Sequence, residues 1–162
     1  MVLPRTYIHK RSSRGFTLIE ILVVMGLFVI LAGFGLFVSM DSFRGYMFRN
    51  ERDVVISLLQ KARSQAINNM CFGGGCTGGK AHGVHFGPGQ YVVFQGLSYV
   101  SRDSAVDEVT PVENNASSVV GSDVIFSPLA ATTSSATVTV SGTDGHTSII
   151  SIATEGQITW TH

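Results

Sequence analysis

The feature that most constrains this chain is an uncharged apolar run at residues 21–38. Its 18 residues would form a helix of roughly 27 Å, close to the roughly 30 Å of a membrane's hydrocarbon core. A secretory signal has a shorter apolar region, of about 7 to 15 residues, and is cut after it. The run therefore predicts a membrane-spanning helix. A plain signal anchor, or a secretory signal cut near Ala32-Gly33, are the alternatives.

A carboxylate stands where this helix begins, in the order Arg14-Gly15-Phe16-Thr17-Leu18-Ile19-Glu20. An unpaired charge in an apolar phase costs several kcal/mol, so Glu20 requires a partner. The dipole at a helix N-terminus would make Glu20 tolerable without any further role. It would not account for the Gly15-Phe16 pair that precedes it.

This order resembles the leader of prepilins, the precursors of type IV pilin-like proteins such as minor pilins and pseudopilins. The resemblance implies that prepilin peptidase cuts between Gly15 and Phe16 and N-methylates Phe16. It also implies that Glu20 then pairs with the new α-amino group of a neighbouring subunit's Phe16. The expected partners are prepilin peptidase, other pilin or pseudopilin subunits and the inner membrane.

The charges are distributed unevenly along the chain. Residues 1–15 contain four basic side chains and no acid, whereas the remainder has a balance of −4. Because positive segments stay on the cytoplasmic side, we expect a cytoplasmic leader and an extracytoplasmic C-terminal domain, held by a single pass through the inner membrane. After processing, the subunit would enter a periplasmic or surface filament.

Four regions follow from these patterns: a leader at 1–15, the transmembrane half of a helix at 16–40, its amphipathic half at 41–70, and a β-rich domain at 71–162. No proline interrupts residues 16–69, which allows one helix of about 54 residues with a weak point at Gly33 and Gly35. The apolar face of the amphipathic half recurs at three- and four-residue steps. Its members are Met47, Val54, Val55, Leu58, Leu59, Ala62 and Ala66.

Asn68-Asn69 and the glycine-rich stretch at residues 71–79 are expected to stop the helix, with glycine as the natural residue for a left-handed cap, and the patterns beyond them are those of β-strands. Residues 84–86 and 91–95 predict a hairpin, residues 98–122 an irregular polar segment, and residues 124–126, 137–140, 148–153 and 157–160 further strands. Asp144-Gly145 predicts a turn. The predicted fold class is α+β, with a long N-terminal helix packed on one antiparallel sheet of about five to seven strands.

The second half resembles the globular domain of the GspH/FimT family. The resemblance is carried by Val124-Ile125-Phe126-Ser127-Pro128, the strands that follow, and the final Glu155-Gly156-Gln157-Ile158-Thr159. It implies a pilin-like subunit that works by assembly.

Cys71 and Cys76 enclose a short, glycine-rich loop, which predicts a local disulfide in an oxidising compartment. The alternative is a zinc site completed by His82 and His85. The spacing is short for such a site, and no flanking helix presents the histidines. We therefore expect a disulfide and no metal.

No enzyme active site is predicted. Asp144 and His146 fall in a predicted turn, and no serine occupies a strand-to-helix elbow. An acidic loop lacks the spacing of a calcium site; its members are Asp103, Asp107, Glu108 and Glu113. We therefore expect no catalytic residues and no cofactor.

Nucleic-acid binding is also not expected. After residue 70 the chain has two basic residues, Lys80 and Arg102, against seven acids, a balance of −5 that repels phosphate. The sequence thus favours a structural subunit, a minor pilin or pseudopilin of a type IV pilus or type II secretion filament. The alternatives are a single-pass membrane-anchored binding domain and a minor pilin for DNA uptake.

Overall fold

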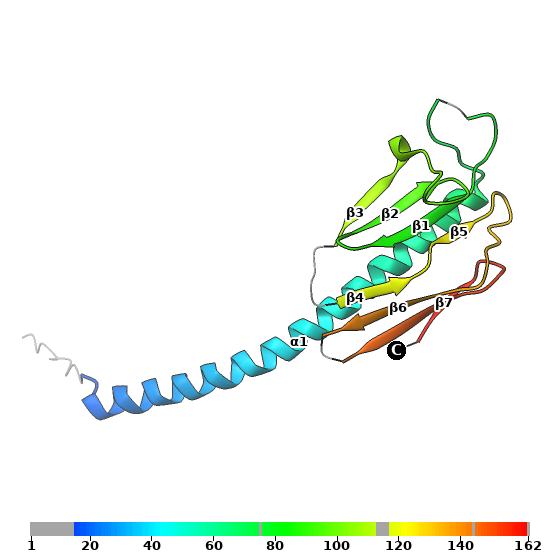
Figure 1. Cartoon of the computed structure of the whole chain (residues 1–162). Helices are drawn as coiled ribbons and strands as arrows, with labels where there is room; N and C mark the ends of the chain where they lie inside the picture. The colour runs from blue at the N-terminus through cyan, green and yellow to red at the C-terminus, as the bar shows by residue number, and fades with distance from the viewer. Residues whose placement is uncertain (1–14, 75, 113–116, 144, 162) are drawn as a thin grey trace, which may run out of the picture. The chain divides into compact units, whose positions relative to one another are not determined.

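The computed structural model describes residues 15–74, 76–112, 117–143 and 145–161, with the side chains of residues 36–41 left out. The predicted leader lies almost wholly outside the described residues. The chain divides into two compact units, Met1–Met40 and Asp41–His162. The described elements are α1 (Leu18–Ile67), β1 (His82–Gly87), β2 (Gln90–Gln95), the 3-10 turn η1 (Ser104–Val106), β3 (Glu108–Pro111), β4 (Ser117–Gly121), β5 (Val124–Phe126), β6 (Ala136–Gly142), β7 (Thr147–Ile152) and β8 (Ile158–Trp160) (Figure 1).

The helix α1 is continuous over 50 residues, so the predicted single helix is confirmed. It passes through Gly33 and Gly35 without a break. The helix ends at Ile67, directly before the predicted stop, and Asn69 rather than a glycine takes the left-handed conformation there, at φ 53°. Two backbone N–H groups there still satisfy carbonyls of the last turn: that of Asn69 donates to Ala66 and that of Met70 donates to Gln65.

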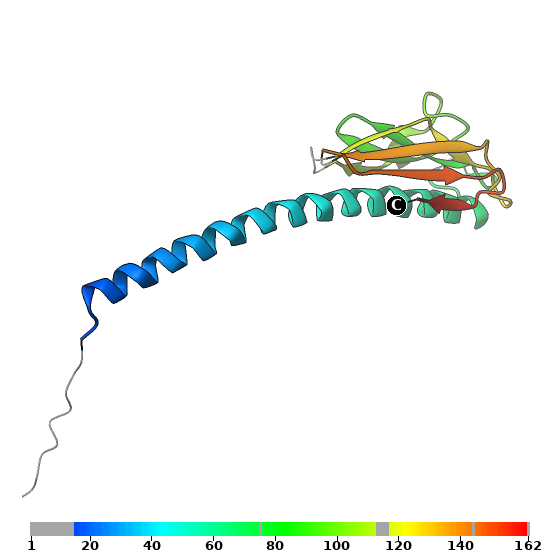
Figure 2. The same ribbon diagram turned by 90° about the horizontal axis from the view of Figure 1, so that it is seen from below.

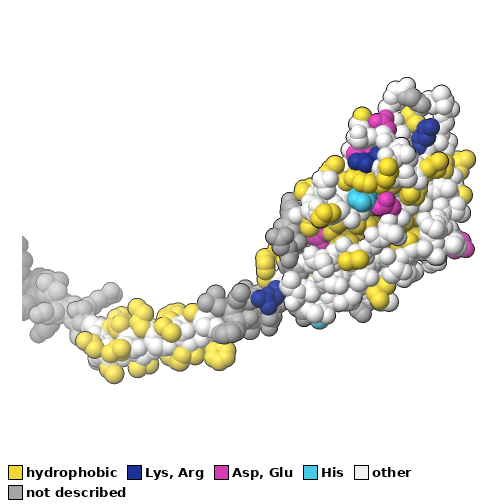
Figure 3. Space-filling view, in the orientation of Figure 1, with side chains coloured by type: hydrophobic (Ala, Val, Ile, Leu, Met, Phe, Trp, Pro, Cys, Tyr) yellow, Lys and Arg dark blue, Asp and Glu magenta, His cyan; other side chains and the backbone are white. Residues whose placement is uncertain are grey.

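Within the first unit, the segment Leu18–Gly35 is long and apolar enough to cross a membrane, judged by length and composition. Its side chains are exposed, and Figure 3 shows hydrophobic groups over its visible surface. Glu20 is the only charged residue within it. An exposed apolar helix of this length is suited to lipid or to other apolar helices.

In the second unit, the amphipathic half of α1 packs against the sheets, as Figures 1 and 2 show from two directions. Val55, Leu59, Ala62 and Ala66 are completely buried, which confirms the predicted apolar face. Two polar residues of this half of the helix, Glu51 and Gln65, are buried as well.

The strands form two four-stranded antiparallel sheets, ordered β3-β2-β1-β5 and β4-β6-β7-β8. The prediction of one sheet is therefore wrong. The reason lies at Ser122 and Asp123, the only residues between β4 and β5. The chain changes sheet at this point, so β4 pairs with β6 and β5 pairs with β1.

The irregular segment predicted at residues 98–122 is also wrong, since it contains β3, β4 and η1. Both strands are short and lie at sheet edges, where alternate residues stay exposed. Because the exposed positions include Val109 and Val120, no alternation of apolar and polar residues marks these strands in the sequence. The predicted hairpin is confirmed as β1 and β2, with His85 opposite Val92 in its register.

The loop after β2 covers the outer face of the first sheet. Tyr99 stacks on His85 with ring centroids 3.7 Å apart, and it meets Phe94 edge-on at 5.6 Å. The Arg102 guanidinium lies 3.7 Å from the centre of the same Tyr99 ring. This cover explains why β2 is buried on both faces from Tyr91 to Gln95.

Strand β3 is attached to α1 by its first residue. Lys61 forms an ion pair with Glu108, and Gln65 donates a hydrogen bond of 3.0 Å to the same carboxylate. The hydrogen bond from Lys61 holds the pKa of Glu108 below its ordinary value of 4.5. The pair is partly exposed, so it contributes less than about 1 kcal/mol.

We predict that Glu108→Gln lowers the melting temperature at neutral pH and that the difference from wild type disappears in acid. A carboxyl whose folded pKa is depressed stabilises the fold above its unfolded pKa, and this stability is lost as the pH falls below about 4.5. Thermal melts of the full chain from pH 7 to pH 3 measure this. Lys61→Met should show the same trend, and a difference that persists at pH 3 would contradict the assignment.

Candidate functional site

The residues around the predicted cut lie at the start of α1. Gly15, Phe16 and Thr17 precede the helix and have no regular secondary structure. The Phe16 side chain is 79% exposed. A β-carbon at Gly15 would meet nothing within 4 Å. The Gly15–Phe16 bond is therefore neither part of the helix nor covered by the described residues.

Thr17 and Glu20 form a reciprocal pair of hydrogen bonds at the N-terminus of α1. The Glu20 backbone N–H donates to Thr17 Oγ1 at 3.3 Å, and the Thr17 N–H donates to Glu20 Oε2 at 3.5 Å. This is a capping box, which satisfies two N–H groups that a helix start leaves without partners. The Thr-x-x-Glu spacing that signals it is present in the sequence, and the sequence prediction missed it.

The capping box leaves Glu20 able to accept a further donor. Its side chain is exposed, and its Oε1 has no hydrogen bond with the described residues. Cutting the chain after Gly15 would create an α-amino group on Phe16, a cation able to form such a bond. The helix start thus combines an accessible peptide bond with a carboxylate that can bind the product's positive charge.

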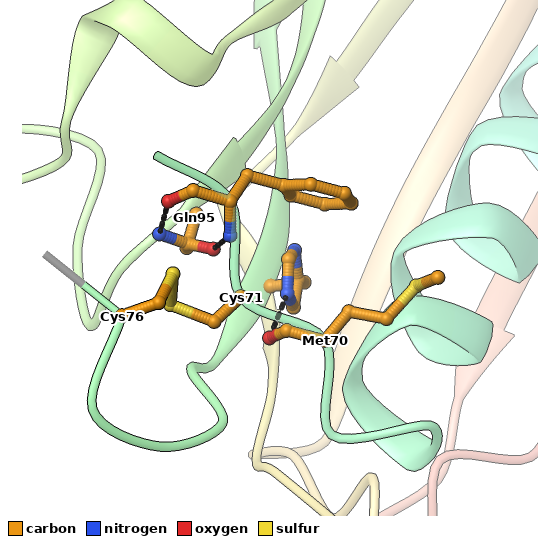
Figure 4. The surroundings of a disulfide bond; sticks show 6 residues. Met70, Cys71, Cys76 and Gln95 are labelled. Carbon is orange, nitrogen blue, oxygen red and sulfur yellow. Dashed lines mark hydrogen bonds between the residues drawn. A yellow bond between two sulfur atoms is a disulfide. The ribbon is translucent and has the colours of Figure 1, made fainter. Parts of the chain in front are cut away.

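Cys71 and Cys76 lie directly after α1 and are joined by a disulfide (Figure 4). Both sulfurs are therefore unavailable as zinc ligands. The histidines of the zinc alternative have other partners: His82 Nε2 lies 3.1 Å from the Met70 carbonyl and His85 Nδ1 lies 2.6 Å from Asp123 Oδ1. Among the described residues no three His, Cys, Asp or Glu side chains are placed to hold a metal.

Gln95 connects the disulfide loop to the sheet. Its Nε2 donates to the Phe72 carbonyl at 3.2 Å, and its Oε1 accepts from the Phe72 N–H at 2.7 Å (Figure 4). A side-chain amide thus pairs with the backbone as a neighbouring strand would. The start of the loop is thus fixed to the buried strand β2, and nothing in the sequence pattern singled Gln95 out.

The other candidate residues bind elsewhere in the fold. Asp103 caps η1 by accepting from Ala105 N–H, and Asp107 pairs with Arg102 at 2.7 Å. With Glu108 bound by Lys61, these carboxylates do not form the acidic loop considered for calcium. Glu113 and Asp144 lie outside the described residues. His146, which falls in the predicted turn, packs its ring 6.0 Å from that of Phe48.

The family model for the prokaryotic N-terminal methylation motif matches residues 10–36. That range contains Gly15, Phe16, the capping box and most of the apolar segment. No curated protein and no solved structure matches the chain. The motif and the apolar helix fit an anchor in the inner membrane. Together they indicate a type IV pilin-like protein that prepilin peptidase processes and that assembles with other pilins.

Proposed function

We propose that this chain is a minor pilin or pseudopilin of the GspH/FimT type, a structural subunit of a type IV pilus or of a type II secretion filament. The observation that carries the proposal is the start of α1. There, an accessible Gly15–Phe16 bond precedes a capping box, and its carboxylate is the only charge in an apolar helical segment.

This geometry supports assembly through the helix. The segment Leu18–Gly35 would lie in lipid before assembly and against the apolar segments of neighbouring subunits after it. In both settings Glu20 is a charge in an apolar phase, and it needs a cation. Cutting after Gly15 supplies that cation on Phe16. Processing and assembly therefore depend on the same few residues.

We propose a structural role rather than catalysis, and we expect no nucleic-acid binding by the β part. The described residues beyond Met70 carry Lys80 and Arg102 as their only basic residues, and Arg102 already pairs with Asp107. This arrangement does not collect phosphate groups. A minor pilin for DNA uptake would instead have to present basic side chains on this surface.

We predict that the mature protein begins with N-methylated Phe16. Mass spectrometry of the protein from membranes of its native host would detect the new N-terminus and its single methyl group. An intact N-terminus beginning at Met1 would contradict the proposal and favour the single-pass anchored binding domain.

Gly15→Val is expected to block the cut without changing the fold, because a side chain at Gly15 meets nothing within 4 Å. Gly26→Ala is the matched control, since Gly26 has the same open surroundings but lies within the helix.

A strain in which the gene for this protein is deleted, scored for both surface filaments and exported enzymes, would separate a pilus from a secretion filament.

A further inference from the structure

A hollow lies beside the last turns of α1, in the second unit of the chain, where the turn before β8 passes the helix. Its volume is about 380 Å³. One wall is the helix and the residue that follows it, and the other is the segment 156–158. The lining residues are Gln60, Arg63, Ser64, Ile67 and Asn68 on the first wall, and Gly156, Gln157 and Ile158 on the second.

Arg63 is the charged member of this lining. Three Arg or Lys side chains of the described part of the chain are partly buried, namely Arg52, Arg63 and Arg102. Arg52 pairs with Asp53, and Arg102 pairs with Asp107. Arg63 forms no hydrogen bond or ion pair with any described residue. Because a guanidinium is positively charged throughout the physiological pH range, the hollow holds a cation without a counter-ion from the described chain.

The Arg63 side chain is held against the turn that precedes β8. Two backbone hydrogen bonds of 2.9 Å close this turn: Gly156 donates to the Ala153 carbonyl, and Ala153 donates to the Gln157 carbonyl. A β-carbon at Gly156 would lie 3.2 Å from Arg63 Nε, which is buried and has no hydrogen-bond partner. The two terminal nitrogens also lack partners within the described chain but are not buried. They are therefore the part of the guanidinium that a ligand in the hollow can reach.

The lining as a whole suits a carboxylate. Two N–H groups of a guanidinium match the two oxygens of a carboxylate. Gln60, Ser64 and Gln157 are exposed and can donate further hydrogen bonds. A phosphate would bring about two negative charges, against the one positive charge of this lining. Ile67 and Ile158 add apolar surface, which favours an acid that carries methylene groups.

We propose that this hollow is a binding site for the carboxylate group of a short aliphatic acid. The terminal nitrogens of Arg63 would donate to both carboxylate oxygens, while the methylene groups pack on Ile67. A free organic acid and the Glu side chain of another protein present this same chemistry. The site does not depend on the proposed function, because its residues belong to the second unit and take no part in processing at Gly15.

The first test uses phenylglyoxal, a reagent that modifies guanidinium groups, on the full chain in detergent. Peptide mass spectrometry follows the rate at Arg63 and at Arg44, which is exposed on the same helix but outside this hollow. A single charged pair gives a dissociation constant on the order of 10 mM, so about 100 mM butyrate should slow modification of Arg63 about tenfold. The rate at Arg44 should not change.

Matched solutes define the ligand class. Acetate should protect Arg63 less than butyrate does, because it lacks the methylene groups. Chloride, sulfate at equal ionic strength, and the neutral isostere butyramide should give no protection. Equal protection by sulfate and butyrate would show a general anion site, and the carboxylate assignment would be wrong. Absence of protection by butyrate, or equal protection of Arg44, would also overturn the proposal.

Arg63→Met tests the same contact through thermal stability. The variant keeps an aliphatic stem beside Gly156 but removes the cation. Butyrate at about ten times its dissociation constant should raise the melting temperature of the wild type, relative to chloride, by about 5 °C more than that of Arg63→Met. Arg44→Met should behave as the wild type does. An equal rise in Arg63→Met would show that butyrate acts elsewhere, which contradicts the site.

Washed membranes from the native host distinguish the two sources of the carboxylate. A protein-borne carboxylate would protect Arg63 in these membranes without added acid, and detergent would remove the protection. With a free acid as the ligand, Arg63 would be reactive in the membranes until butyrate is added. If butyrate protects Arg63 in neither preparation, the proposal is wrong. Cleavage after Gly15 is scored in the same membranes, and its absence would contradict the proposed function but not the carboxylate site.

Discussion

Filaments from cells carrying Glu20→Ala are expected to contain this protein at less than about a tenth of the wild-type level, although the chain is still cut after Gly15. The charge-assisted hydrogen bond that we propose between Glu20 and a neighbour's Phe16 amine would be lost, and such bonds contribute about 1.5–3 kcal/mol, a decade or more in an equilibrium constant. The measurement compares the protein in purified filaments with that in the membrane.

Thr17→Val separates this pairing from the stability of the helix start. It removes the hydroxyl that accepts from the Glu20 N–H and leaves the carboxylate in place. The lost cap costs about 1 kcal/mol of local helix stability. Incorporation into filaments should stay near the wild-type level. Normal incorporation of Glu20→Ala would refute the pairing, and equal failure of Thr17→Val would attribute the effect to the capping box instead.

Gly156→Ala is expected to destabilise the second unit by about 2–4 kcal/mol, combining backbone strain with a steric clash. Gly156 is buried at a φ of 73°, a conformation that side chains rarely adopt. An added β-carbon would lie 2.3 Å from the Ala131 carbonyl oxygen, which is backbone and cannot rotate away. Thermal unfolding of the full chain in detergent, followed by circular dichroism, measures the loss.

Gly145→Ala is the matched control, because Gly145 has a similar φ of 86° and nothing within 4 Å of an added β-carbon. It carries the strain without the clash, so we expect a loss of about 1 kcal/mol. Equal effects of the two substitutions would show that the contact between the Gly156 turn and Ala131 is not restrictive.

The parts of the fold that the sequence could predict are those with strong local patterns. The helix is evident because apolar residues such as Val55, Leu59 and Ala62 recur at helical spacing and no proline interrupts them. The hairpin of β1 and β2 is evident because two apolar runs flank Gly87-Pro88-Gly89. In both cases the pattern that predicts the element lies within residues that are close together in the sequence.

The sheet arrangement could not be predicted in the same way. Strands β3 and β4 are short, and their exposed alternate residues include Val109 and Val120, so the sequence shows no alternation of buried apolar and exposed polar residues there. The change of sheet between β4 and β5 depends on which distant strands, β6 and β1, are available for pairing. Such choices are set by tertiary packing rather than by local propensity.

The residues of the candidate site differ in the same way in how far the sequence alone predicts them. Gly15, Phe16 and Glu20 are identified by their order along the chain, and the Thr17–Glu20 capping box could have been predicted from its spacing. The role of Gln95 could not, since it arises from the backbone of Phe72, 23 residues away along the chain.

The short passage of the chain from β4 into β5 couples the two sheets. Only Ser122 and Asp123 separate β4, which belongs to one sheet, from β5, which belongs to the other. Unfolding of either sheet would therefore disturb a strand of the other. The two sheets should therefore unfold together, as one cooperative unit. A protease would then encounter either the intact fold or a fully open chain, with no half-unfolded form in which a single sheet is exposed.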